Sequence, residues 1–93
     1  DKLEIQLTSS AVDDLNCIPE IAKKKIIASI QKISADPFSH GSTIKKLKEF
    51  KPLIYRIRSG DLRVLYRVHD KTVIILRVID RKDLERIIKR LNL

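Results

Sequence analysis

Arginines crowd one short stretch of the chain, YRIRSGDLRV at residues 55–64. The stretch reads as two β-strands joined by a tight turn at Ser59-Gly60, because alternating sequence flanks a turn-forming glycine. With those two residues as the loop, Arg56 lies directly opposite Arg63. Like charges in directly opposed positions destabilise a sheet, so this arrangement needs a physical explanation.

Three explanations compete for these arginines. The side chains can fan out into water beside acids such as Asp61, Glu49 and Glu85, since exposed ion pairs are common. The register can instead be shifted by one residue. The third explanation is a built anion site, because an oxyanion between planar guanidinium groups converts repulsion into attraction. For any single arginine, exposure to water beside an acid is the more common arrangement, but four arginines share one sheet face in this register, which raises the anion site above its usual frequency. They are Arg56, Arg58, Arg63 and Arg67.

Hydrophobic periodicity predicts the elements that must position these side chains. KLEIQLT alternates like a strand, and a short helix capped by Ser9 or Ser10 should follow it. A second helix should begin at Pro19, where the missing N–H costs nothing, and end at Asp36-Pro37. The basic segment KKLKEF is a candidate edge strand. Three strands then form a meander, and DRKDLERIIKRLNL predicts a final helix with Asp80 as its N-cap. The meander strands are expected at 53–58, 62–69 and 72–79.

The element order β-α-α-β-β-β(-β)-α predicts one α+β domain over residues 1–93. Strands joined by tight turns are antiparallel, so we expect a small twisted antiparallel sheet with the helical hairpin on one face. The meander face that carries Tyr55, Tyr66 and Arg77 is the expected main core. Val78 is placed on the arginine face, which should be apolar towards one end and cationic towards the other.

The net charge of +8 is concentrated in the second half of the chain. Residues 1–44 carry five Lys or Arg against six Asp or Glu, whereas residues 45–93 carry fifteen against six. This asymmetry suggests a polyanionic partner, either nucleic acid or an acidic protein.

Composition narrows the classes of protein to which this chain can belong. No apolar run is long enough to span a membrane and no signal peptide opens the chain, so we expect a cytoplasmic protein without a membrane partner. The single Cys17 cannot form an internal disulfide and is expected to be a buried or half-buried filler. Cys, His and carboxylates show no metal-ligand spacing, so we expect no metal and no other cofactor.

The pattern YRIRSGDLRVLYRV, followed by VIILRVI and a basic residue pair, resembles the RelE/ParE toxin superfamily of type II toxin–antitoxin systems. The resemblance covers nearly the whole chain in the family's element order. Its RelE branch implies a ribosome-dependent mRNA endoribonuclease, in which a 2′-hydroxyl attacks the adjacent phosphate. Its ParE branch implies a gyrase inhibitor that acts by binding. We favour the RelE branch, because the predicted helical hairpin is compact.

By position in the motif, the resemblance implies four catalytic basic residues that would stabilise the charged phosphorane. They are Arg56, Arg58, Arg63 and Arg81. Other basic residues are candidate contacts to RNA or the ribosome. They are Lys45, Lys46, Lys48, Arg67 and Lys82.

Two departures from the family pattern concern proton transfer. No tyrosine lies near Ile87, where that branch often carries one, and Asp80 stands where many relatives have histidine. Arginine is a poor general base, so the four arginines form a phosphate clamp without an evident proton shuttle. His40 and His69 are possible substitutes for that shuttle.

The resemblance also implies a cognate antitoxin as partner, beside the ribosome and mRNA or, in the alternative, DNA gyrase. We expect the antitoxin to cover the four arginines or to displace the final helix at 80–91. We also expect Arg63→Ala to have little effect on folding, because it would relieve the charge of Arg56 opposite.

Overall fold

Five strands build one sheet in the part of the chain that this computed structural model describes, residues 2–38, 44–47 and 53–91. In chain order they are β1 (Glu4–Leu7), β2 (Ile44–Leu47), β3 (Ile54–Ser59), β4 (Leu62–His69) and β5 (Thr72–Asp80). The spatial order is β1-β5-β4-β3-β2. Strands β2 to β5 are antiparallel, as tight turns require. This confirms the predicted α+β fold, with β1 added in parallel along β5.

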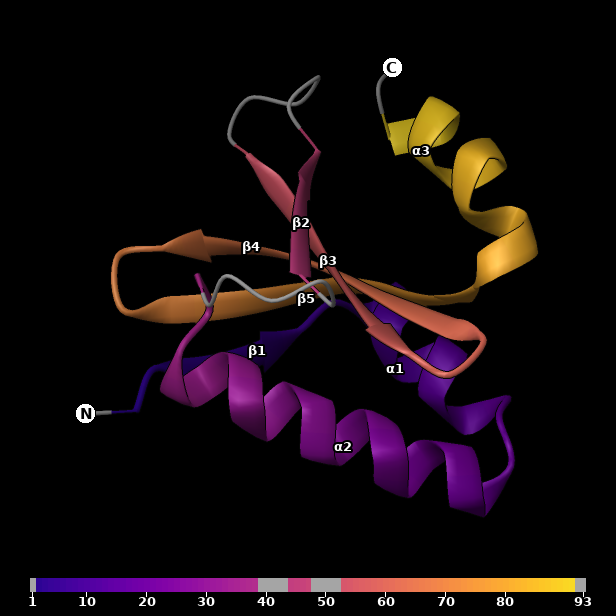
Figure 1. Cartoon of the computed structure of the whole chain (residues 1–93), viewed down its shortest axis with the longest axis horizontal. Helices are drawn as coiled ribbons and strands as arrows, with labels where there is room; N and C mark the ends of the chain where they lie inside the picture. Colours follow the sequence, from indigo (N-terminus) through magenta and orange to yellow (C-terminus); the bar gives the residue numbers. More distant parts are fainter. Residues whose placement is uncertain (1, 39–43, 48–52, 92–93) are drawn as a thin grey trace.

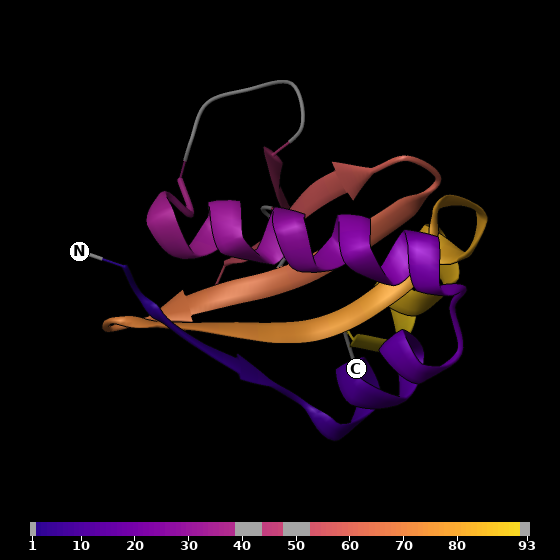
Figure 2. The ribbon, with the colours of Figure 1, turned by 90° about the horizontal axis from the view of Figure 1, so that it is seen from below.

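Helices cover both faces of the sheet. α1 (Ser9–Asn16) and α2 (Glu20–Ala35) lie on one side, and α3 (Leu84–Leu91) lies on the other (Figures 1 and 2). α2 begins at Glu20 with Pro19 as its N-cap, one residue later than predicted, and it ends before Asp36 as predicted. No described helix combines the length and the apolar composition needed to cross a membrane.

The N-cap of α1 is Thr8, which corrects the predicted cap at Ser9 or Ser10. Thr8 Oγ1 accepts a hydrogen bond from the Ala11 amide at 3.1 Å and donates one to the Leu76 carbonyl at 2.8 Å. This second bond ties the start of α1 to β5. Cys17, just past the end of α1, is exposed, so its predicted role as a core filler is wrong.

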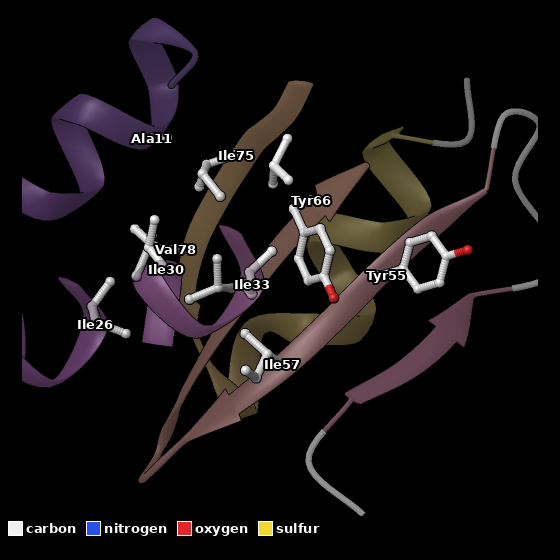
Figure 3. Packing of buried hydrophobic residues seen from close by; sticks show 11 residues of the cluster. Ala11, Ile26, Ile30, Ile33, Tyr55, Ile57, Tyr66, Ile75 and Val78 are labelled. Carbon is white, nitrogen blue, oxygen red and sulfur yellow. The ribbon is translucent and has the colours of Figure 1, made fainter. Parts of the chain in front are cut away.

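The main core lies between α2 and the sheet, on the face predicted to hold it. Ile26, Ile30 and Ile33 of α2 point at the sheet, where Tyr66 and Ile75 are fully buried (Figure 3). A second, smaller core lies beneath α3. Its buried members are Ile54, Leu65, Ile79 and Ile87.

A β-bulge in β5 changes the faces of its last residues. Leu65 pairs with Arg77 and Tyr66 pairs with Ile75, which leaves Leu76 as the extra residue. An extra residue shifts the two-residue alternation of the strand. Val78 therefore packs in the main core and not on the arginine face, where strict alternation had placed it.

Tyr66 makes the fold sensitive to alkali. Its hydroxyl donates to the Pro37 carbonyl at 2.8 Å, and burial is the largest reason why its pKa lies above the ordinary 10.0. The protonated phenol therefore contributes its full stability below pH 10.0, and this contribution is lost as pH rises, because the unfolded chain ionises first. We expect the free energy of unfolding to fall by about 1.4 kcal/mol by pH 11 through this residue.

Urea unfolding of the wild type and of Tyr66→Phe at about pH 8 and about pH 11 measures this effect. The variant is expected to be less stable at the lower pH, where the hydrogen bond matters, and to lose less stability on alkalisation. An equal alkaline decline in both proteins would assign the effect to other groups.

Candidate phosphate-binding site

The turn between β3 and β4 is the two-residue loop Gly60-Asp61, one residue later than predicted. Gly60 has φ of 60°, a left-handed value that glycine adopts readily and that suits the first position of a type II′ hairpin turn. The shift pairs Arg58 with Arg63, which corrects the predicted opposition of Arg56 and Arg63. Two arginines are nevertheless directly opposite each other.

Arg63 turns its guanidinium back over this turn. Its Nη1 donates to the carbonyl oxygens of Gly60 and Leu62, each at 3.0 Å. The residue is only 5% exposed, and its Nε is buried without a hydrogen-bond partner among the described residues. Removing the side chain would leave two carbonyls without this donor, so the expectation that Arg63→Ala hardly affects folding has to be revised.

Arg81 reaches the same turn from the end of β5. Asp80 is an N-cap, as predicted, and its carboxylate accepts from the Lys82 amide at 3.0 Å. This cap starts a short 3-10 helix, Arg81–Asp83, that leads into α3. The backbone amide of Arg81 donates to the Asp61 carbonyl at 2.8 Å. This bond holds the hairpin turn next to the backbone of Arg81, whose side chain is exposed.

Three arginines act electrostatically on Arg63, and we call the four together the basic cluster: Arg56, Arg58, Arg63 and Arg81. The pKa of Arg63 lies below its ordinary value because the side chain is buried and because the charges of the other three oppose a fourth. The negative charge of Asp61 has the opposite effect and raises the pKa of Arg63. The tertiary structure thus brings together the four arginines that the sequence singled out.

Neighbouring acids do not neutralise the basic cluster within the described residues. Ion pairs there join Arg77 to Asp14 and Arg86 to Asp83, and His69 lies 3.5 Å from Asp70. Neither Asp61 nor Glu85 forms one with the cluster, and Glu49 lies outside the described residues. The cluster therefore presents positive charge that a bound anion could neutralise.

The other predicted contact residues divide between two faces. Lys45 is the cross-strand partner of Arg56, so the two side chains share a face. Lys46 pairs with Tyr55 and lies on the opposite face. Lys82, which is exposed, directly follows Arg81. Two further candidates stand apart: Arg67 lies further along β4 opposite Ile74, with Nε buried and unpaired within the described part, and Lys48 lies outside it.

Tyr55, Tyr66 and His69, which are the histidine and tyrosine residues within the described part of the chain, lie away from the basic cluster. Tyr55 and Tyr66 are buried on the α2 side with their rings stacked 5.5 Å apart. His69 is exposed at the far end of β4, 3.5 Å from Asp70, and His40 lies outside the described residues. Residues 2–38, 44–47 and 53–91 also contain no group of three potential metal ligands. The positive charge of the basic cluster can attract an anion, but arginine is a poor general base.

One anchoring ion pair could not be read from the sequence. Asp14 of α1 accepts from Arg77 Nε at 2.7 Å, from Arg77 Nη2 at 3.1 Å and from the Val78 amide at 2.9 Å. The pKa of Arg77 is raised, chiefly by its hydrogen bond to Asp14 and against the effect of burial. The pair connects α1 to the bulged part of β5, a few residues before Arg81 and Lys82. Its members are 63 residues apart in the sequence.

Comparison with known proteins gives a consistent family. Residues 5–85 match the family model described as the ParE toxin of the type II toxin–antitoxin system parDE. No protein of curated function matches the sequence.

Solved structures share the fold. An archaeal RelE–RelB complex from Pyrococcus horikoshii contains a chain that is 24% identical, with a TM-score of 0.75 over 87% of this chain and 97% of that one. The RelBE2 toxin–antitoxin complex from Mycobacterium tuberculosis gives 27% identity and a TM-score of 0.72 over 87% and 100%. A RelB–RelE antitoxin–toxin complex from Methanococcus jannaschii gives 28% and 0.71 over 88% and 96%.

Proposed function

We propose that this chain, which belongs to the ParE toxin family of type II toxin–antitoxin systems, stops translation by cutting mRNA on the ribosome. The observation that carries the proposal is the basic cluster. Arg58 and Arg81 are exposed, Arg56 is half-buried, and all three lie within electrostatic reach of the buried Arg63. The phosphodiester backbone of RNA suits such a site, because it offers each exposed guanidinium an anionic phosphate as a partner.

The expected reaction cuts RNA through its own 2′-hydroxyl. The O2′–P bond forms, the P–O5′ bond breaks, and the products carry a 2′,3′-cyclic phosphate and a 5′-hydroxyl. Negative charge grows on the phosphoryl oxygens on the way, where the guanidinium groups of Arg58 and Arg81 can donate hydrogen bonds. One proton leaves the 2′-hydroxyl and one reaches O5′. Because the described cluster lacks a neutral-pH acid or base, ribosomal groups or water would carry these protons, which accords with cleavage that requires the ribosome.

Primer extension on a defined mRNA tests the proposal. The purified protein is added to translating ribosomes and, in parallel, to the same mRNA without ribosomes. We expect cuts at codons in the ribosomal A site, with 5′-hydroxyl ends, and much less cutting of free mRNA. Intact mRNA under conditions where translation is otherwise active would contradict the proposal.

A gyrase inhibitor is the second candidate, and two observations favour it. The matching family model is the ParE toxin, and the basic cluster consists of arginines, which are poor general bases. In this case the arginines would form a binding surface. A supercoiling assay with purified gyrase separates the candidates, because inhibition together with uncut mRNA on ribosomes would assign the protein to this function.

A cognate antitoxin is the expected protein partner, as in the toxin–antitoxin complexes that share this fold. An acidic segment could mask the basic cluster, whose charge attracts it. Alternatively it could displace α3, which covers the small core around Ile87. A structure of the complex in which both regions stay untouched would contradict this expectation.

A further inference from the structure

The turn at Gly60-Asp61 connects two members of the basic cluster through its carbonyl groups. Arg63 Nη1 donates to the carbonyls of Gly60 and Leu62. Between them, the Asp61 carbonyl accepts the amide of Arg81 at 2.8 Å. Three successive carbonyls are therefore occupied, two by the side chain of Arg63 and one by the backbone of Arg81. The conformation of the turn therefore affects the position of the Arg81 backbone, from which the Arg81 side chain extends.

Arg63 itself is badly placed to touch a ligand. It is 5% exposed, Nη1 is committed to two carbonyls, and Nε is buried. Arg58, directly opposite on β3, and Arg81 are both exposed. Substrate can therefore reach Arg58 and Arg81 much more readily than Arg63.

Fold stability alone does not explain a cation at this position. Burial and three neighbouring arginines work against the charge of Arg63, as the lowered pKa shows. An apolar side chain facing Ile79, its cross-strand neighbour in the small core, would avoid both penalties. The guanidinium is explained by what only it can do here, which is to donate to two turn carbonyls through charge-assisted hydrogen bonds.

We propose that Arg63 is a positioning residue: it holds the β3–β4 turn, and through the turn it places Arg58 and Arg81 for contact with a phosphate chain. The proposal rests on the proposed function only in taking RNA as the ligand. It separates the basic cluster into contacting arginines and one that acts through them, although position in the sequence motif makes all four equivalent.

Amide hydrogen exchange of the free protein tests the positioning directly. The variants are Arg63→Met and Arg63→Lys, with Arg58→Met as the matched control on the opposing strand. Both Arg63 variants are expected to speed exchange of the Arg81 amide at least about tenfold while the core amides of β4 keep their protection. Arg58→Met should change the Arg81 rate less than about twofold. Unchanged Arg81 exchange in both Arg63 variants would overturn the proposal, as would global unfolding of both.

Affinity for RNA provides the second readout, because substitution of a purely structural residue would not change it. Affinity for a fluorescein-labelled single-stranded RNA oligonucleotide is measured by anisotropy over a series of salt concentrations. Arg58→Met should weaken binding and reduce the salt slope by about 0.7, as expected for one lost phosphate contact. Arg63→Lys, which keeps the charge, should weaken binding at least about tenfold with the slope unchanged.

Each outcome separates the two proposals. Wild-type RNA affinity in Arg63→Lys would overturn the positioning role. The role would also be overturned if Arg63→Met reduced the salt slope of RNA binding as much as Arg58→Met does while the Arg81 amide still exchanged slowly. Failure of the wild type to bind the oligonucleotide would count against RNA as the ligand. In that case the exchange data alone would still decide whether Arg63 holds the turn.

Discussion

Arg58→Ala will slow cleavage of ribosome-bound mRNA by roughly 100-fold, and Arg81→Ala will do so by a similar factor. Both side chains are exposed beside the buried charge of Arg63. Each can therefore donate to phosphoryl oxygens, and loss of one such donor to a developing charge typically costs about 2.7–4 kcal/mol of transition-state stabilisation, the lower value being a factor of about 100 in rate. Single-turnover primer extension with saturating ribosomes measures the rate of the chemical step.

Lys32→Ala is the matched control for this experiment. Lys32 is exposed in the last turn of α2, across the sheet from the basic cluster, so its loss removes one positive charge without touching the site. We expect its cleavage rate to stay within about twofold of the wild type. If cleavage is ribosome-dependent but equally fast in Arg58→Ala and Lys32→Ala, the nuclease works through another surface.

Asp14→Ala will produce the largest loss of stability expected from a single polar substitution in this chain, about 2–4 kcal/mol. It leaves the Arg77 guanidinium and the Val78 amide without their acceptor. The side chains of Arg77 and Asp14 are 29% and 17% exposed, so water replaces the lost carboxylate only in part. Urea unfolding monitored by circular dichroism gives the change in free energy.

Two further variants identify the source of that loss. Asp13→Ala changes the preceding carboxylate, which is exposed on α1, and should alter stability by less than about 0.5 kcal/mol. Combining Asp14→Ala with Arg77→Met removes the unpaired cation and should recover about 1–2 kcal/mol. Equal effects of Asp14→Ala and Asp13→Ala would show that the Asp14–Arg77 pair contributes little in solution.

Local sequence determined the elements of this protein and the composition of the basic cluster. Apolar residues recur with a helical period in α2 and alternate in β3 and β4, so the elements and their inward faces follow from neighbouring residues alone. The same alternation placed Tyr55 and Tyr66 in the core and Arg56 and Arg58 on the opposite face. Local chemistry also identified the cap at Asp80, because a helix start depends on a few adjacent residues.

Tertiary structure decided what depends on contacts between distant residues. The parallel pairing of β1 and the bulge at Leu76 depend on backbone partners far away in sequence. Asp14 gains its role only because α1 packs against that bulge. Burial of Arg63 depends on the second core and on a turn one residue later than alternation suggested. Periodicity can count the arginines on a face, but only the folded turn distinguishes the one it buries from those it leaves exposed to a ligand.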